Sequence, residues 1–224
     1  MNPVKPGETA RTPWIVGVSG ASGTPYAAAV LRALLAAGES VDLVVSRASR
    51  LTLLDETGIS FRDAHWEADL REWLSRGADG KPGSFQVDIA GVRHWSAGDL
   101  AAGPSSGSYP VKGMLIVPAS TACVAGVALG LSKDLLQRAA SVTLKERRKL
   151  VVAVRETPLN GQTLRHLVAL DDAGASVVPA SPGFYAGATH IQDLVDFVAG
   201  RVLDAAGVEH GLYRRWNGEL GNGT

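Results

Sequence analysis

The sequence predicts an α/β fold in which helices cover both faces of a mostly parallel sheet. Short apolar runs rich in β-branched residues recur along the chain, as is typical of strands buried on both faces. Segments of helical length separate them, and this alternation favours a doubly wound, Rossmann- or flavodoxin-like three-layer sandwich. No linker or shift in composition divides the 224 residues, so we expect a single domain over residues 14–208.

The first strand, turn and helix form the most informative unit of the chain. Trp14–Val18 is expected to be a buried strand, and the turn over residues 19–23 contains only Ser, Gly and Ala. Thr24 can cap the helix that follows, and Pro25 suits its first turn. Such a turn directs backbone N–H groups and a helix dipole at an anion, but it also suits any tight βα connection.

The second strand, Val41–Val45, ends at Ser46 and leads into a helix that reaches Glu56. Residues at the carboxyl end of a parallel strand face the ligand crevice of an open α/β sheet. Ser46 is therefore either a binding residue or the cap of the next helix. These two interpretations have equal weight from the sequence.

The rest of the chain continues the alternation of strands and helices. We expect further strands over residues 92–95 (at a sheet edge), 113–118, 150–154 and 176–179. We expect further helices over residues 66–74, 124–130, 135–148, 163–170 and 191–206. One strand ends at Arg155-Glu156, and a cation beside a carboxylate at that position favours a functional site over a structural ion pair.

Composition excludes several classes of protein. Lys plus Arg and Asp plus Glu both number 22, so no global basic field favours nucleic acid. The single cysteine excludes an internal disulfide and a cysteine-based zinc site, and the five histidines show no metal-ligand spacing. No apolar run is long enough for a membrane span. Residues 1–13 are expected to form a disordered arm on a cytoplasmic protein.

Five motifs together give the sequence a family resemblance. They are Gly17-Val-Ser-Gly-Ala-Ser-Gly23, Arg138-Ala-Ala140, Leu144-Lys-Glu-Arg-Arg148, Arg155-Glu-Thr-Pro-Leu159 and Pro182-Gly-Phe-Tyr185. With these motifs the chain resembles the UbiX-type flavin prenyltransferases, within the wider group of flavoproteins that includes the flavin-dependent cysteine decarboxylases. The resemblance extends over nearly the whole chain.

The resemblance implies an enzyme that joins a dimethylallyl group from dimethylallyl monophosphate to N5 and C6 of reduced FMN. The product would be prenylated FMN, which UbiD-type decarboxylases use. The resemblance also implies no metal and a homo-oligomer, for which a dodecamer is expected. Residues 209–224 would then form a tail that packs on a neighbouring subunit.

The resemblance also assigns site residues. Contacts with FMN fall on Gly20, Ala21, Ser22, Ser46, Ser120, Thr121, Ala122, Cys123, Arg138 and Arg155. The prenyl phosphate would be held by Lys145, Tyr185 and Arg201. Catalytic roles fall on Ser22, Glu56, Lys145, Glu156 and Trp216. Lys133 and the pair Ala122-Cys123 depart from the pattern of relatives.

These residue types suit the chemistry. Breaking an allylic C–O bond leaves negative charge on phosphate, which Lys145 and Arg201 can stabilise. The aromatic face of Trp216 can stabilise the allyl cation. Ring closure at C6 releases a proton, for which Glu156 or the phosphate is the acceptor.

Two alternatives remain open. A flavin-dependent cysteine decarboxylase would share the fold and the FMN site, but its PASANT-type motif is only partly matched at residues 118–122, and no histidine precedes His65. A non-catalytic FMN-binding subunit of an aromatic acid decarboxylase would tolerate the loss of Lys145 or Glu156, which are both present.

Overall fold

The computed structural model describes residues 11–216 and residue 218. Residues 1–10 of the predicted arm lie outside this range, as does most of the tail after Trp216. The last residues of the predicted arm belong to the fold. Arg11 forms an ion pair with the buried carboxylate of Asp42, and its guanidinium also donates to the Val41 carbonyl at 2.7 Å.

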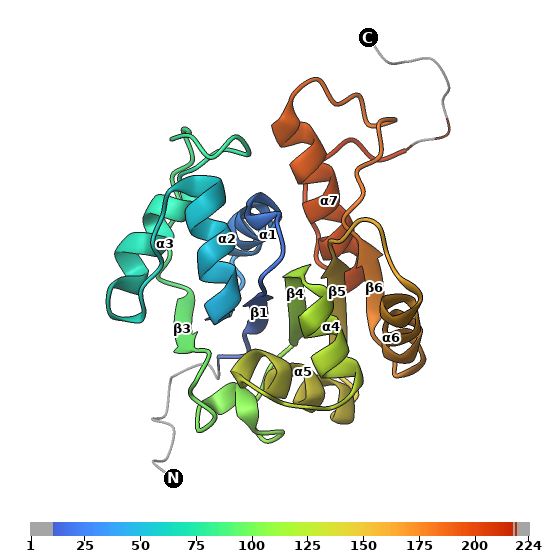
Figure 1. Ribbon diagram of the computed structural model, residues 1–224. Helices are drawn as coiled ribbons and strands as arrows, with labels where there is room; N and C mark the ends of the chain where they lie inside the picture. Colours follow the sequence, from blue (N-terminus) through green and yellow to red (C-terminus); the bar gives the residue numbers. More distant parts are fainter. Residues whose placement is uncertain (1–10, 217, 219–224) are drawn as a thin grey trace.

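Six strands form one parallel sheet in the order β3-β2-β1-β4-β5-β6 (Figure 1). The chain builds outward from β1 in one direction, then returns to add β4 on its other side. The strand bounds are β1 Trp14–Val18, β2 Val41–Val45, β3 Val92–Ser96, β4 Gly113–Ala119, β5 Lys149–Val154 and β6 Ser176–Pro179. The predicted doubly wound fold is confirmed.

Helices cover both faces of the sheet, which gives the three expected layers (Figure 1). The first face carries α1 Thr24–Ala36, α2 Arg47–Thr57, α3 Trp66–Leu74 and α7 Ile191–Ala206. The second face carries α4 Thr121–Ala128, α5 Leu135–Lys145 and α6 Gly161–Asp172. Two short 3₁₀ turns, η1 Asp63–His65 and η2 Gly103–Ser105, lie in connections.

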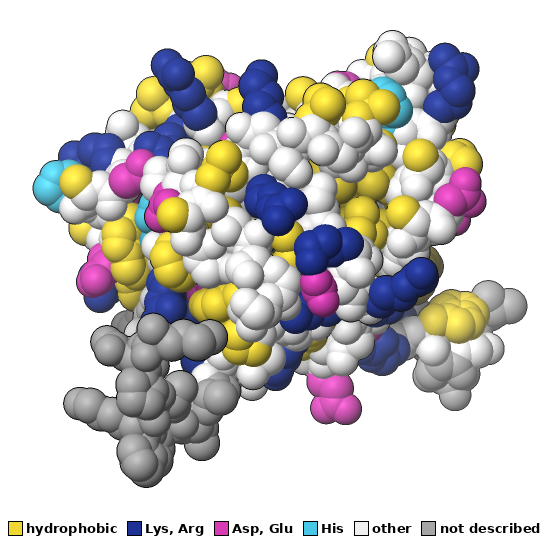
Figure 2. Space-filling view, turned by 90° about the horizontal axis from the view of Figure 1, so that it is seen from below, with side chains coloured by type: hydrophobic (Ala, Val, Ile, Leu, Met, Phe, Trp, Pro, Cys, Tyr) yellow, Lys and Arg dark blue, Asp and Glu magenta, His cyan; other side chains and the backbone are white. Residues whose placement is uncertain are grey.

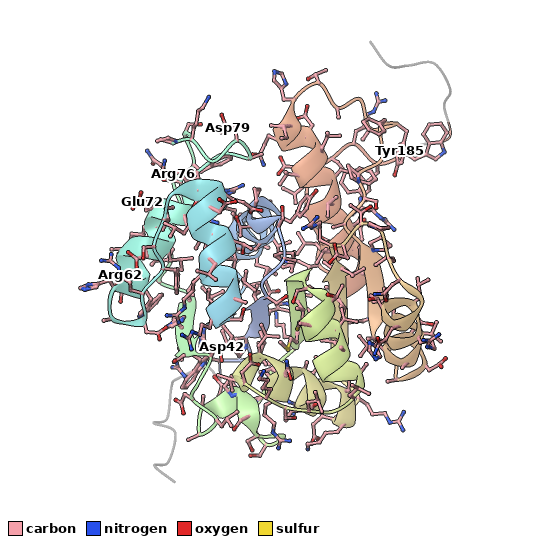
Figure 3. The ribbon with its side chains drawn as sticks, in the orientation of Figure 1. Asp42, Arg62, Glu72, Arg76, Asp79 and Tyr185 are labelled. Atoms are coloured by element: carbon pink, nitrogen blue, oxygen red, sulfur yellow. The ribbon has the colours of Figure 1, made fainter. Side chains whose placement is uncertain are left out.

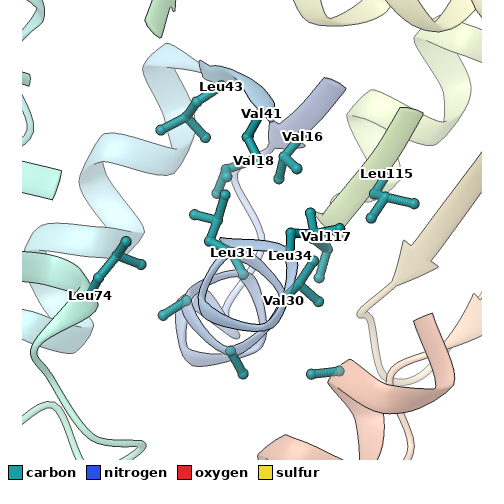
Figure 4. Packing of buried hydrophobic residues seen from close by; sticks show 14 of the residues in the cluster. Val16, Val18, Val30, Leu31, Leu34, Val41, Leu43, Leu74, Leu115 and Val117 are labelled. Carbon is teal, nitrogen blue, oxygen red and sulfur yellow. The ribbon is translucent and has the colours of Figure 1, made fainter. Parts of the chain in front are cut away.

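The core explains why the strands are continuous apolar runs. Val16 and Val18 of β1 pack toward Leu31 of α1 (Figure 4), whereas Ile15 packs on the opposite face among α4 and α5. Because side chains alternate along a strand and both faces are covered, every residue of β1 is buried. The first turn is therefore held on a rigid platform.

The predicted elements agree with the structure to within a few residues at most ends. The largest shifts are of three residues. α5 ends at Lys145 rather than at residue 148, and α4 begins at Thr121 rather than at residue 124, because the Ser120 hydroxyl caps the helix by accepting from Cys123 N at 3.3 Å. Among the described residues, no helix combines the length and apolarity that a membrane crossing requires.

Candidate functional site

The carboxyl ends of β1 and β4 lie side by side at the point where the winding of the sheet reverses. The side chain of Ser19 joins the two turns that follow these strands: its Oγ donates to the Pro118 carbonyl at 2.9 Å and accepts from Ser120 N at 2.7 Å. Ligands of open α/β sheets bind in this crevice. The two small-residue turns therefore form one rigid edge.

A cavity of about 410 Å³ opens on this edge, over the face that carries α4 and α5. Small side chains dominate its lining. The turns and strand ends contribute Ser19, Gly20, Ser46, Ser120, Ala122 and Cys123, and the helix starts contribute Arg47, Ala48, Lys133, Asp134, Leu136 and Gln137. Of the predicted FMN contacts, Ala21 and Thr121 lie in the same two turns without lining this cavity.

Three helices begin at this cavity. Ser46 caps α2 by accepting from Ser49 N at 3.1 Å, Ser120 caps α4, and Asp134 caps α5 by accepting from Gln137 N at 2.9 Å. Ser46 thus caps a helix, as one of the two interpretations predicted, and also lines the cavity, where its role as a binding residue stays a prediction. Three positive helix ends and adjoining backbone N–H groups suit a phosphate.

Gly20 brings the first turn against α2. A Cβ atom at this position would lie 2.5 Å from Ala48 Cβ, so only glycine fits without movement of the turn. The close approach leaves the backbone of the turn open to a ligand. Gly20 also lines the cavity, so its predicted contact with FMN stays a prediction that the space at this position allows.

The start of α1 is capped by Glu56 and not by Thr24. The Glu56 carboxylate accepts from Gly23 N at 2.8 Å, Thr24 N at 2.8 Å and Thr24 Oγ1 at 2.6 Å. The expectation that Thr24 caps its own helix is wrong, because the cap residue is Gly23 with φ of 114° and no side chain to accept with. Glu56 therefore positions the turn.

A second cavity of about 440 Å³ lies on the other side of the same turn. Ser22, Glu56 and Arg155 line it together with an apolar wall: Pro25, Tyr26, Pro182, Ile191, Leu194 and Val195. Arg155 Nε donates to the Ser22 carbonyl at 3.1 Å, which connects the end of β5 to the turn. Glu156 follows on the exposed side, where its carboxylate accepts from Thr157 N at 2.9 Å.

The predicted phosphate and aromatic residues of the C-terminal region form a separate cluster. Tyr185 lies beside the C-terminal tail, above the strand ends (Figure 3). Its ring meets the Trp216 ring edge-on at a centroid distance of 6.2 Å, and both residues are more than half exposed. Arg201 of α7 donates to Asp204 at 2.9 Å and points toward the Tyr213 hydroxyl at 3.4 Å.

Lys145 and Arg138 lie apart from both cavities. Lys145 ends α5 on the far face of the sheet from α7, near the amino ends of the strands, and forms an ion pair with Glu146. The helix from Leu135 to Lys145 has 11 residues, so its ends lie about 15 Å apart. Arg138 Nε donates to the Ser105 carbonyl at 3.1 Å. Within one chain, these two cations do not meet Arg201.

The residues that depart from the pattern of relatives, Lys133 and the pair Ala122-Cys123, all line the first cavity. Burial raises the pKa of the Cys123 thiol to about 12, so the thiol remains protonated at neutral pH. Lys133 lines the cavity mouth and adds positive charge there. Asp134 and Gln137 also line the cavity and were not predicted from the sequence. Asp134 carried a signal, since an aspartate directly before a helix is a common cap.

Among the residues that the structure describes, no group of three or more His, Cys, Asp or Glu side chains is arranged to hold a metal ion.

Comparisons with known proteins place this site in a family. The flavoprotein family profile matches residues 4–203. A flavin prenyltransferase UbiX from Streptomyces coelicolor is 91% identical over 209 residues, which are 93% of this chain and 97% of that protein.

Two solved structures share the fold over nearly their whole length. The complex of AnUbiX (PadA1) with FMN and dimethylallyl pyrophosphate has a TM-score of 0.77 and 33% identity, and covers 93% of this chain and 99% of its own. A dodecameric FMN-dependent UbiX-like decarboxylase from Escherichia coli O157:H7 has a TM-score of 0.77 and 35% identity, and covers 92% and 100%. The chain belongs to the flavoprotein family and, within it, to the UbiX flavin prenyltransferases.

Proposed function

We propose that the protein joins the dimethylallyl group of a dimethylallyl phosphate to N5 and C6 of reduced FMN and so makes prenylated FMN. The observation that carries this proposal is the convergence of three helix N-termini and two small-residue turns on one cavity at the switch point of the sheet. The identity with the Streptomyces UbiX protein supports the same activity.

FMN fits the first cavity by its chemistry. Its phosphate would accept from the N–H groups at the starts of α2, α4 and α5, with the hydroxyls of Ser46 and Ser120 beside it. Its flat ring would lie against Gly20 and the adjoining turn, which present backbone and no long side chain. When bound and reduced, FMN supplies the nucleophilic atoms N5 and C6.

The donor would lie between Ser22 and the C-terminal cluster. When the allylic C–O bond breaks, the phosphate leaves with the electron pair, and Lys145, Tyr185 and Arg201 hold it. Trp216 faces the allyl cation. The Glu156 carboxylate, or the departing phosphate, would accept the proton that C6 of the flavin loses on ring closure.

This site needs more than one copy of the chain. Lys145 and Arg138 extend from the second face of the sheet, whereas Arg201 belongs to α7 on the first face. The view from below shows Lys and Arg side chains near the middle of the surface on that side of the molecule (Figure 2). We propose that Lys145 and Arg138 of one copy complete the site of another within a homo-oligomer, for which the dodecameric E. coli relative is the precedent.

The proposal also covers the destination of the product and the identity of the prenyl donor. The product would pass to a UbiD-type decarboxylase in the cytoplasm, as the family resemblance implies. The AnUbiX complex holds dimethylallyl pyrophosphate, whereas the resemblance implies the monophosphate. Both donors therefore belong in the test.

The test is an anaerobic incubation of the purified protein with reduced FMN and each donor in turn, followed by mass spectrometry of the released flavin. We expect a flavin heavier than FMN by one five-carbon prenyl unit. Unchanged FMN with both donors would contradict the proposal and favour a non-catalytic flavin-binding subunit. A Glu156→Gln variant sharpens the distinction, because an enzyme should lose turnover, whereas a pure binder should keep the activity of its partner decarboxylase.

A further inference from the structure

Asp204 lies on α7, three residues after Arg201, where four side chains donate to one carboxylate. The donors are Arg201 Nη1 at 2.9 Å, Arg215 Nη2 at 2.7 Å, the Tyr213 hydroxyl at 2.5 Å and His210 Nε2 at 3.1 Å. The Asp204 side chain is only 16% exposed.

These donors come from two segments of the chain. Arg201 belongs to α7, and His210, Tyr213 and Arg215 belong to the tail that follows Gly207. The tail residue after Arg215 is Trp216, whose ring contacts Tyr185. Further packing supports the arrangement, because the Tyr213 ring lies 5.0 Å from Phe197 and 5.4 Å from His210 between centroids.

We infer that Asp204 is a positioning residue of the prenyl-donor site, which orients Arg201 for the phosphate and anchors the tail that carries Trp216. The inference rests on the proposed function for the roles of Arg201 and Trp216. Its geometric part, the joining of α7 to the tail, stands on the hydrogen bonds alone.

The arrangement leaves Arg201 able to bind an anion. A guanidinium has five N–H donors, and the bonds to Asp204 and Tyr213 both use Nη1. The remaining donors point from a side chain that is 52% exposed. The Asp204 carboxylate therefore fixes the orientation of the Arg201 guanidinium and leaves its other N–H donors free to bind a phosphate.

The charge of Asp204 is what holds this arrangement together. Burial acts to raise the pKa of Asp204, but hydrogen bonds from Tyr213, Arg215 and His210 outweigh it and lower that pKa to about 2. The carboxylate is thus ionised at neutral pH, and its bonds to the two arginines are charge-assisted. An amide at the same position would turn a donor toward the cations.

The experiment compares Asp204→Asn with the wild type in three measurements: steady-state prenylation with dimethylallyl monophosphate, FMN affinity, and hydrogen exchange of residues 210–216. We expect KM for the donor to rise about tenfold or more, because Arg201 would no longer be oriented to bind the donor phosphate in the ground state. FMN affinity should stay within about twofold, since Asp204 does not line the flavin cavity. Exchange in the tail should accelerate.

Two matched variants complete the design. Glu209→Gln removes one exposed carboxylate from the same tail and should leave all three measurements unchanged. Asp204→Glu keeps the charge and should recover part of the loss in KM. If Asp204→Asn fails to fold, Tyr213→Phe removes one of the four donors, keeps the ring contacts, and should still raise KM and tail exchange.

Wild-type KM and wild-type tail exchange in Asp204→Asn, or in Tyr213→Phe where the first variant does not fold, would overturn the inference. Failure of the proposed function gives a different result, namely a wild type that transfers no prenyl group. In that case the exchange measurement still tests whether Asp204 anchors the tail.

Discussion

The flavin cavity and the C-terminal cluster are built from different kinds of chemical group. The cavity uses backbone, glycine and short hydroxyl side chains at the ends of buried strands, and Ser19 and Glu56 fix its turns through buried or partly buried hydrogen bonds. The cluster uses the long side chains of Tyr185, Arg201 and Trp216, which are largely exposed in a single chain.

This difference shows which half of the site one chain can complete alone. The cavity is formed within one copy, so added volume should damage it. The cluster presents charge and aromatic surface without enclosure, so removal of charge should damage it. Lys145 lines neither the cavity nor the C-terminal cluster of its own chain. The cavity therefore belongs to one copy, whereas we propose that the phosphate site is shared between copies.

The largest expected effect comes from Lys145, the cation that we propose one copy supplies to the site of another. Lys145→Ala should lower the prenylation rate by about a hundredfold or more, because the leaving phosphate loses a preorganised cation. FMN affinity should change much less, since Lys145 is proposed to hold the donor phosphate and not the flavin. Lys149→Ala, an exposed lysine at the start of β5, is the matched control for kinetic assays. Loss of activity in that control as well would indicate a general charge effect.

A smaller effect is expected from volume added to the cavity. Gly20→Ala places a Cβ 2.5 Å from Ala48 Cβ, so the turn must shift into the space for the flavin. Overpacking of this kind should weaken FMN binding by about tenfold to a hundredfold, measured by quenching of flavin fluorescence. Gly98→Ala meets no atom within 4 Å and should bind FMN normally. Unchanged affinity in Gly20→Ala would place the flavin elsewhere.

The smallest effect concerns pH and the cavity wall. The folded Cys123 thiol ionises near pH 12, and its ordinary pKa is 9.0, because burial opposes the thiolate. The stability from this raised pKa is complete below pH about 9 and is lost as pH rises toward 12. The free energy of unfolding should therefore fall more steeply above pH about 9 in the wild type than in Cys123→Ala. Equal slopes in urea titrations would mean that the thiol is solvated in the folded protein.

The sequence predicted the fold because its signals are local. A run such as Trp14–Val18 is apolar at every position only when both sheet faces are covered, and Ser46 or Ser120 caps the helix that follows it directly. The Glu56 cap could not be predicted, because it depends on how α2 lies against the start of α1. The Asp204 centre likewise forms only when the tail folds back on α7.

The assembly of the site could not be predicted from spacing either. Lys145 and Arg201 carry a family resemblance in sequence, but nothing in their spacing says that they lie on opposite faces of the sheet. Only the three-layer arrangement separates them. The proposed shared role of these two residues therefore implies two copies, and that implication is open to a direct test.

The most direct test is activity of a mixed oligomer. Lys145→Ala and Arg201→Ala chains, differently tagged and co-expressed, would be purified together and assayed for anaerobic prenylation of reduced FMN. Each variant alone should be nearly inactive. If Lys145 and Arg201 of one site come from different copies, as we propose, random one-to-one mixing should restore about a quarter of wild-type activity. Mixed oligomers as inactive as either variant alone would contradict the shared site.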